Sequence, residues 1–500
     1  MFKKLSLAAA LFLLPLIVFC ETINIYHTSD THGFYFPREI NGKRAGGFAA
    51  LAALLARDGG PHLLLDSGDW TSGTAEAKDS KGYLSVQFMN MLGYNASTIG
   101  NHELDFKEDA MLKNIERAKF DILAANIYDT KLKGLPAHVK PFKIYMAGGR
   151  KIAVIGIAKD FGSSQKRFRI SKDRKALKKA MRQLGPLKPD AVVLLDHNSI
   201  DDDKHDDPNS PSELVKGIGG IDLVLGGHAH KIIQNAVIDG TVFVESGTAL
   251  DGVSKVSLDF EDKGGGLKSI KSEYIELDVS KTGEDFYIKE FAEANRDKAL
   301  DIVISKANET IFKYLPQTPA AAQQTNKQID SPLANIFADL LKDYAAADIG
   351  IINTGNIRDD LPRGPITKRL VLEISPFPNK IMTVEVNGNF LRKLVRDALK
   401  GDKSLFQYSA NMRVKYIMKG KKKPRDIEIM INGAPLDGKK MYSLALCDYI
   451  ALGNSEGYMF KKITGRKPAG SKTVTDLFTD YLRKNQQGIK GAKTGRIIMD

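Results

Sequence analysis

Residues 100–106 of the chain read Gly-Asn-His-Glu-Leu-Asp-Phe, and they directly follow the strand-like run Ala96–Ile99. An amide, an imidazole and two carboxylates are therefore packed into a few positions at the end of an expected strand. Polar groups gathered at a strand end are typical of a site that performs chemistry. We take Asn101, His102 and Asp105 as candidate site residues and expect Glu103 to play a supporting role.

The same arrangement recurs on both sides of this stretch. Strand-like runs alternate with helix-like segments at about 47–57, 81–92, 108–118 and 174–184. Such alternation predicts an α/β domain in which helices cover the sheets. Four further expected strands also lead into polar residues: 22–29 into Asp30 and His32, 62–65 into Asp69, 191–196 into His197, and 221–225 into His228 and His230.

These side chains form a set that suits metal ions. The carboxyl ends of strands in an open α/β sheet meet at one crevice, so residues far apart in sequence can converge there. Imidazole and carboxylate ligands suit zinc, manganese or iron alike, and one carboxylate can bridge two ions. Asp69, beside the flexible Gly68, is the bridging candidate. Two divalent ions at such a site would activate a water molecule and hold phosphoryl oxygens.

A second region follows a change in composition. Residues 285–314 are polar and helix-favouring and indicate a helical linker, which Pro316 and Pro319 end. A further α/β pattern begins near Gln328, with strands and turns over 412–446. We interpret the lysine-rich run at 419–425 as a solvated hairpin tip. The expected division is a signal peptide at 1–20, a first domain at 21–290, a linker at 291–325 and a second domain at 326–500.

The composition limits the classes of partner. The chain has 500 residues, 43% of them hydrophobic and 27% charged, as expected for a soluble protein with more than one domain. Its formal net charge of +13 favours anionic partners in general. The sequence contains no zinc finger, no RNP-type motif and no basic helix with interleaved aromatics. We therefore expect no nucleic-acid polymer as a partner.

The N-terminus predicts export. Lys3 and Lys4 precede an apolar run, Leu5–Phe19, that is short for a membrane span. We interpret it as a signal peptide cleaved after Cys20, which predicts a periplasmic or secreted protein. A lipid anchor on Cys20 is the competing interpretation, but the bulky Phe19 fits lipoprotein processing poorly. Cleavage leaves only Cys447, so no intramolecular disulfide is expected. No second segment is long and apolar enough to span a bilayer.

The ordered motifs of the first region resemble those of the calcineurin-like metallophosphoesterases. With the second region, the chain resembles the 5′-nucleotidase and UDP-sugar hydrolase family over nearly its whole mature length. This resemblance implies an N-terminal metallophosphoesterase domain, with mixed sheets sandwiched by helices, and a C-terminal α/β substrate-binding domain. The motifs that carry it are Asp30-Thr31-His32, Gly68-Asp69, Gly100-Asn101-His102-Glu103, His197 and Gly227-His228-Ala229-His230.

The resemblance also implies a role for each of these residues. His102 and Asp105 match the family's catalytic pair, in which the imidazole stabilises charge on the phosphoryl group. Asp105 can keep His102 protonated and oriented through a charge-assisted hydrogen bond. Two divalent cations, zinc, manganese or similar, are implied. One would be held by Asp30, His32, Asp69 and His230, and the other by Asp69, Asn101, His197 and His228.

The motifs of the second region are looser. Residues 353–358, Asn-Thr-Gly-Asn-Ile-Arg, resemble the family's Asn-Gly-Gly-Gly-Ile-Arg segment, which implies that Arg358 contacts substrate. Residues 376–379 resemble its Pro-Phe-Gly-Asn segment, which implies that Asn379 reads the base or ribose. The family stacks the nucleobase between two aromatic rings, for which Tyr458 and Phe406 are the candidates. The segment 452–458 departs from the usual Gly-Gly-Asp-Gly pattern, so the leaving group stays open.

The expected function is therefore that of an exported phosphatase with two metal ions that hydrolyses nucleotide phosphate esters. A 5′-nucleotidase that also cleaves UDP-sugars is the first expectation. The alternative within enzymes is a 2′,3′-cyclic-nucleotide phosphodiesterase with 3′-nucleotidase activity. Relatives of that kind tend to have Asn where this chain has Asp105. An alternative of another class is a nucleotide-binding or surface protein that has lost catalysis.

Overall fold

The computed structural model describes residues 22–40, 42–160, 167–200, 210–261, 265–314, 327–398, 406–418 and 424–500. The expected signal peptide with Cys20 lies outside the described residues, and so do residues 419–423 of the lysine-rich run. By its internal contacts the chain divides into two units. Unit 1 comprises residues 1–72 and 77–295, and unit 2 comprises residues 73–76 and 296–500.

Unit 1 contains two large mixed sheets. The first has the strand order β17-β16-β1-β4-β5-β6-β8, and the second has the order β14-β15-β13-β12-β10-β9. The strands of the first sheet are β1 (Thr22–Thr28), β4 (His62–Asp66), β5 (Ala96–Ser97), β6 (Asp121–Leu123), β8 (Val139–Lys140), β16 (Gly252–Phe260) and β17 (Leu267–Glu276). Those of the second are β9 (Phe142–Ala147), β10 (Arg150–Ile157), β12 (Ala191–Asp196), β13 (Leu223–Leu225), β14 (Ile232–Ile238) and β15 (Thr241–Ser246).

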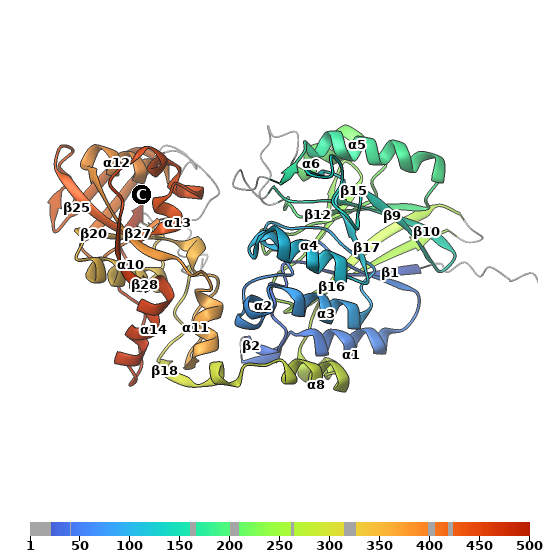
Figure 1. The fold of residues 1–500 in the computed structure, drawn as a ribbon, viewed down its shortest axis with the longest axis horizontal. Helices are drawn as coiled ribbons and strands as arrows, with labels where there is room; N and C mark the ends of the chain where they lie inside the picture. Colours follow the sequence, from blue (N-terminus) through green and yellow to red (C-terminus); the bar gives the residue numbers. More distant parts are fainter. Residues whose placement is uncertain are drawn as a thin grey trace, which may run out of the picture. The chain divides into compact units, whose positions relative to one another are not determined.

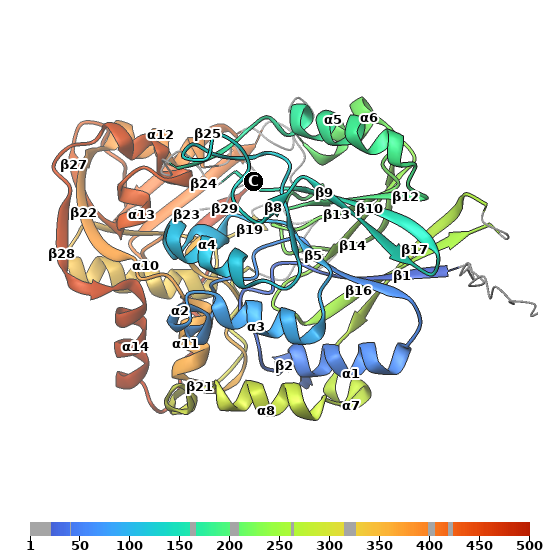
Figure 2. The ribbon, with the colours of Figure 1, turned by 45° about the vertical axis from the view of Figure 1, so that its right-hand side comes forward.

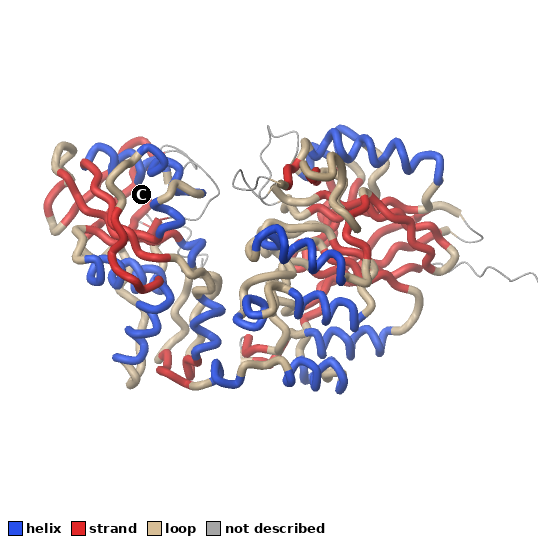
Figure 3. The backbone as a smooth tube through the Cα atoms, viewed as in Figure 1, coloured by secondary structure: helices blue, strands red, loops and turns tan. Residues whose placement is uncertain are grey.

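The two sheets of unit 1 pack face to face with helices outside them. Successive strand residues point to opposite faces. Thus Ile152 and Val154 of β10 join Ile25 of β1 in the core between the sheets, while Ala153 and Ile155 pack under helices on the outside. Figure 1 and Figure 3 show α5 and α6 on one side of the strands and α1, α3 and α8 on the other. This is the predicted α/β arrangement of sheets covered by helices.

Four helices of unit 1 match the segments predicted at about 47–57, 81–92, 108–118 and 174–184. The predicted hairpin at 143–157 is confirmed, since β9 and β10 pair antiparallel. The helices are α1 (Phe48–Asp58), α2 (Ala75–Asp79, at the division of the units), α3 (Tyr83–Leu92), α4 (Lys107–Arg117), α5 (Asp173–Leu184), α6 (Pro211–Ile218), α7 (Val279–Thr282) and α8 (Phe286–Ala294). Two small sheets join β2 (Arg38–Ile40) to β3 (Lys43–Ala45) and β7 (Ile127–Asp129) to β11 (Phe168–Ile170).

Unit 2 contains two five-stranded sheets, with strand orders β23-β20-β27-β22-β28 and β19-β29-β24-β25-β26. Its helices are α10 (Pro332–Ala345), α11 (Lys368–Ile374), α12 (Gly388–Asp397), α13 (Asp448–Ala451) and α14 (Val474–Lys484). The first sheet contains β20 (Ile349–Asn353), β22 (Lys380–Asn387), β23 (Phe406–Tyr408), β27 (Met441–Cys447) and β28 (Lys467–Thr473). The second contains β19 (Lys327–Gln328), β24 (Met412–Met418), β25 (Pro424–Ile431), β26 (Ala434–Pro435) and β29 (Ile497–Met499). Figure 2 shows the same elements in a turned view.

The helical prediction for residues 285–314 is wrong in its second half. Helix α8 ends at Ala294, and a 3₁₀ turn at Lys298–Asp301 leads into the strand β18 (Val303–Ala307). β18 pairs antiparallel with β21 (Gly364–Thr367). The run Ile302-Val303-Ile304 is β-branched and favours a strand over a helix, and its pairing partner lies about 60 residues away in the sequence. None of the described helices is both long and apolar enough to cross a bilayer.

Candidate active site

The register of the strands places the candidate ligands of unit 1 at common sheet edges. In the first sheet Thr28 of β1 lies opposite Asp66 of β4, and Asp66 lies opposite Ser97 of β5. These strands are parallel, so their following loops leave from the same edge. In the second sheet Leu195 of β12 lies opposite Leu225 of β13. The loops that carry the ligands are thereby brought together as the sequence predicts.

Five of the seven expected metal ligands have a left-handed backbone, which non-glycine residues rarely adopt. Their φ angles lie between 48° and 77°. Such conformations cost energy and persist where the surrounding structure requires them, most often at functional sites. The turn at each strand end thereby directs the side chain back toward the sheet edge. The five residues are Asp30, His32, Asp69, His228 and His230.

The first group of ligands comprises Asp30, His32 and His230, whose donor atoms all lie within 4.8 Å of one another. The Nε2 atoms of the two histidines face each other at 3.1 Å. Asp30 Oδ1 lies 3.9 Å from His32 Nε2 and 3.5 Å from His230 Nε2. One carboxylate and two imidazoles converging on a common point are the donor set expected of a transition-metal site.

The second group comprises Asp69, His197 and His228, with donor atoms again within 4.8 Å of one another. Asp69 Oδ2 lies 3.0 Å from His197 Nε2. The same His197 nitrogen lies 3.8 Å from Asp30 Oδ1, so the two groups are adjacent. His197 Nδ1 donates to the carbonyl oxygen of Ser67 at 2.5 Å. This hydrogen bond orients the ring and directs Nε2 at the carboxylates, as is usual for a metal-binding histidine.

Two buried polar atoms fit a cation at this place. Asn101 Oδ1 and His197 Nε2 are shielded from solvent, and neither makes a hydrogen bond of acceptable geometry within the described part of the chain. Buried polar atoms are normally satisfied, and a bound ion is one way to satisfy them. Against the effect of burial, the carboxylates of Asp69 and Asp30 raise the pKa of His197 to about 10. A proton at Nε2 thus offsets the negative charge that a metal ion would neutralise.

His102 and Asp105 form the predicted pair. His102 Nδ1 lies 2.7 Å from Asp105 Oδ2, and Nδ1–H donates to the carboxylate. The other ring nitrogen, Nε2, lies 4.0 Å from Asp69 Oδ2. The imidazole is therefore held between Asp105 and the second ligand group. From this position Nε2 can donate a hydrogen bond to an oxyanion bound beside the metal ligands.

Glu103 is a buried acceptor that joins two ligand loops. Its Oε2 accepts backbone N–H groups of Asp69 at 3.0 Å and Gly100 at 2.6 Å. Its Oε1 accepts those of Trp70 at 3.0 Å and Thr71 at 3.2 Å. In the metal-free protein, burial, followed by the charge of Asp69, raises the pKa of Glu103 to about 8, whereas the N–H groups of Asp69 and Thr71 lower it and so favour the ionised form. Glu103 therefore holds together the loops after β4 and β5. Because both of its oxygens accept backbone N–H groups, we do not count it as a metal ligand.

Two glycines allow these loops to approach each other. A side chain at Gly100 would collide with the Asp69 carboxylate. A Cβ at Gly227 would lie 2.9 Å from Asp30 Oδ2, which is closer than real contacts allow. Both glycines leave space for a ligand side chain from another strand.

Lys159 is a site neighbour that the sequence patterns did not indicate. It follows β10, and its Nζ donates to Asn198 Oδ1 at 2.6 Å, next to His197. Burial lowers the pKa of His228 to about 3, and the positive charge of Lys159 is the second largest cause. β10 is parallel to β12, with Ile157 opposite Asp196. Lys159 could have been predicted from the sequence by looking for polar residues after the strand-like run 151–157, as with the other strands.

In unit 2, two of the four expected substrate residues belong to one loop cluster. Asn379 Nδ2 donates to Asn356 Oδ1 at 2.7 Å, within the loop that ends at Arg358. The Arg358 guanidinium lies 5.9 Å from the centre of the Phe377 ring. Arg358 and Asn379 are both partly exposed. The structure therefore brings the arginine segment and the Pro-Phe-Pro-Asn segment together.

The two aromatic candidates differ in accessibility. Tyr458 is 52% exposed, and its hydroxyl donates to Asp397 Oδ2 at 3.0 Å. Phe406 is only 1% exposed and packs in the core of unit 2, where β23 places it opposite Asn353. A base could stack on Phe406 only after displacement of the core side chains around it.

Lys313 and Tyr314 are further residues near the arginine segment that the sequence patterns did not indicate. The Tyr314 hydroxyl donates to Thr354 Oγ1 at 3.2 Å. Burial, followed by the charge of Arg358, lowers the pKa of Lys313 to about 8. Both residues lie in the segment that composition assigned to a linker, so no motif marked them.

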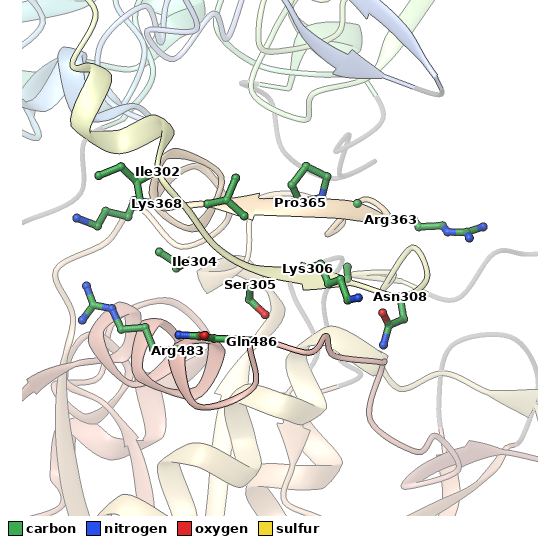
Figure 4. Close-up of a pocket in the computed structure, with 13 residues that line it drawn as sticks. Ile302, Ile304, Ser305, Lys306, Asn308, Arg363, Pro365, Lys368, Arg483 and Gln486 are labelled. Atoms are coloured by element: carbon green, nitrogen blue, oxygen red, sulfur yellow. The ribbon is translucent and has the colours of Figure 1, made fainter.

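Unit 2 also has a hollow of about 970 Å³ beside β18, β21 and the end of α14. Figure 4 shows Ser305 and Gln486 facing each other across it. Its lining includes none of the four expected substrate residues. This hollow is therefore separate from the loop cluster around Arg358.

Comparison with known proteins agrees with this geometry. Residues 23–232 match the family model of the calcineurin-like phosphoesterases, and residues 304–462 match that of the 5′-nucleotidase C-terminal domain. The chain is 27% identical to Protein UshA of Yersinia enterocolitica, over 87% of this chain and 86% of the relative. It is 26% identical to a 5′-nucleotidase of Vibrio cholerae, over 73% of each.

A solved structure shows that the fold is shared over both units. The 5′-nucleotidase precursor from Thermus thermophilus superposes with a TM-score of 0.82 at 22% identity, and the match covers 96% of this chain and 99% of that one. The two family models together span most of the described chain, and the first contains all seven expected metal ligands. The chain belongs to the calcineurin-like phosphoesterases that carry a C-terminal 5′-nucleotidase domain, and it is a phosphoric ester hydrolase.

Proposed function

We propose that the protein is an exported 5′-nucleotidase that binds two divalent cations and hydrolyses phosphate esters of nucleotides, UDP-sugars included. The observation that carries the proposal is the convergence of two ligand groups beside the His102–Asp105 pair. A nucleotide phosphate carries the negative charge that such a centre attracts. Relatives named UshA and 5′-nucleotidase support this choice of substrate class.

The ligand set would hold one cation on Asp30, His32 and His230 and the other on Asn101, His197 and His228. We propose Asp69 as the shared ligand, because its Oδ2 lies 3.0 Å from His197 Nε2 and its Oδ1 accepts the backbone N–H of His102, the residue after Asn101, at 2.8 Å. When bound, two divalent cations activate water and offset phosphoryl charge. Zinc, manganese and iron all suit these donors.

The chain's own residues do the remaining work at the phosphoryl group. Asp105 accepts from His102 Nδ1 and so fixes which ring nitrogen faces the site. His102 Nε2 then donates to an oxygen of the phosphoryl group as negative charge develops on it. Burial of Asp30 and Asp69, at 0% and 1% exposure, keeps bulk water from screening these interactions.

In unit 2, Arg358, Asn379 and Tyr458 are the proposed substrate contacts. Arg358 supplies a fixed positive charge, Asn379 supplies amide donors and acceptors, and the exposed ring of Tyr458 offers a face for a nucleobase. We leave Phe406 out of the proposed set because its ring is buried in the core.

A substrate panel tests the proposal. AMP, 3′-AMP, 2′,3′-cyclic AMP and UDP-glucose are each incubated with the purified protein and manganese or zinc, with and without a chelator, and both the nucleotide or nucleoside products and the released phosphate are measured. We expect turnover of AMP that the chelator abolishes. Preferential turnover of the cyclic or 3′ substrates would refute the 5′-nucleotidase assignment. Absence of turnover on all four substrates with either metal would refute the enzymatic proposal.

A further inference from the structure

Helix α5 presents a stripe of positive charge on its outer face. Lys175, Lys178, Lys179 and Arg182 occupy positions i, i+3, i+4 and i+7, which share one face of a helix, and all four are exposed. The opposite face is used by the core. Its apolar residues Ala176, Leu177, Ala180 and Leu184 are buried against the second sheet and α6.

Among the described residues, the acids near the stripe have other partners. None of the four cations forms an ion pair with another described residue. Asp173, the only acid between residues 171 and 188, accepts a hydrogen bond from Asn126 at 2.8 Å. Glu213 on the neighbouring α6 pairs with Lys216 at 3.0 Å. Like charges at helical spacing destabilise a helix, so the stripe is unfavourable for folding alone.

A shallow apolar hollow lies beside the stripe. It has a volume of about 740 Å³ and is lined by cations of α5 together with Met181 and Ile218. No acidic residue contributes to its lining. Figure 1 shows α5 and α6 side by side on the outside of unit 1. The surface therefore combines a positive rim with a small apolar floor.

We propose that the outer face of α5 docks unit 1 on an anionic phospholipid surface. Clustered Lys and Arg side chains bind anionic headgroups through charge, and the apolar floor suits the glycerol region just below them. Because the apolar face of α5 is buried in the core, the helix lies on the surface and does not insert. A nucleic acid fits less well, since residues 171–188 and 210–218 carry no aromatic side chain on which bases could stack.

The docking is separate from catalysis, and its expected strength follows from the charges. A Lys or Arg near an anionic surface raises the binding constant roughly fivefold. Four such side chains would raise the binding constant by several hundredfold at most. We expect an increase of at least about tenfold, because the four side chains do not all reach the headgroups equally. The binding is electrostatic, so salt should weaken it.

Vesicle sedimentation tests the proposal. The full-length protein is mixed with vesicles of phosphatidylcholine alone or with about one third phosphatidylglycerol, at low and high salt. We expect at least about tenfold stronger binding to the anionic vesicles at low salt, and little preference at high salt. The variant K175Q/K178Q/K179Q/R182Q should lose this preference. Its AMP hydrolysis should match that of the wild type and its melting temperature should be equal or higher, which checks that it is folded.

A matched variant removes the same charge elsewhere. Lys113, Lys119, Lys268 and Lys271 are exposed elsewhere on unit 1, so K113Q/K119Q/K268Q/K271Q should keep the preference for anionic vesicles. All proteins share one N-terminus, so its apolar residues contribute equally. Equal losses in both variants, or no preference in the wild type, would overturn the proposal. Tighter binding of a short DNA duplex than of anionic vesicles would reassign the surface to nucleic acid.

Discussion

Replacing Glu103 by Gln tests how the ligand loops are held together. Each carboxylate oxygen of Glu103 accepts two backbone N–H groups, with Asp69 and Gly100 on one oxygen and Trp70 and Thr71 on the other. Glutamine has nearly the same shape but replaces one oxygen by an NH₂ group. Two buried N–H donors would then face another donor.

The cost follows from those two donors. Each buried polar group left without a partner costs about 1–3 kcal/mol, so the substitution should destabilise unit 1 by about 2–6 kcal/mol. For a unit of this size that corresponds to a fall in melting temperature of about 5–20 °C. The loops that carry Asp69 and Asn101 should also become less ordered, which weakens metal binding.

Thermal unfolding and metal analysis together check this prediction. The control is Glu116→Gln, which removes a charge from an exposed site on α4 and should change stability by less than about 0.5 kcal/mol. Both variants are melted with manganese and with a chelator. The reasoning would be refuted if E103Q melted within about 2 °C of the wild type and kept its full metal content.

Three further substitutions test the catalytic centre, the metal ligands and the nucleotide contact, and a fourth tests a buried acid. His102→Ala should lower kcat by about 10²–10⁴ with metal content unchanged, as measured by steady-state kinetics and elemental analysis. Asp69→Ala should lose bound metal, and retention of two ions would contradict its bridging role. Tyr458→Ala should raise KM for AMP by about three- to tenfold with little change in kcat, whereas Tyr287→Ala, at a more exposed tyrosine on α8, should change neither. Burial raises the pKa of Asp66 to about 7, so the unfolded chain ionises this group at lower pH than the folded chain does. The stability of the metal-free protein should therefore fall by up to about 1.4 kcal/mol per pH unit between pH 4 and 7. Chemical denaturation of Asp66→Asn should show a shallower dependence.

Much of unit 1 could be predicted because its signals are local. The apolar periodicity of 174–184 indicated α5, and the runs 143–146 and 151–157 around Gly148-Gly149 indicated the hairpin of β9 and β10. The family match was equally predictable, since the five metal motifs keep their chemistry within a few residues each. These features depend on residues that are close together in the sequence, so the sequence alone is enough to predict them.

Other features depended on contacts between distant residues. β18 formed because β21 pairs with it, so the polar composition around 285–314 was a poor guide there. The family resemblance implied that Phe406 stacks on the base, but pairing of β23 with β20 buries its ring. Lys159 and Lys313 belong to no sequence motif. Only the folded structure shows that Lys159 lies beside Asn198 and that Lys313 lies near Arg358.

By itself the sequence determined the chemistry of this protein: which carboxylates, amides and imidazoles end its strands, and that His102 stands three residues before the Asp105 that orients it. The tertiary structure alone decided which of these groups meet. Asp30 and His230 are 200 residues apart, and their donor atoms come within 3.5 Å because parallel strands of two packed sheets end at the same side. Left-handed turns and closely packed glycines then direct the side chains inward, a placement set by packing between loops and not by any local pattern.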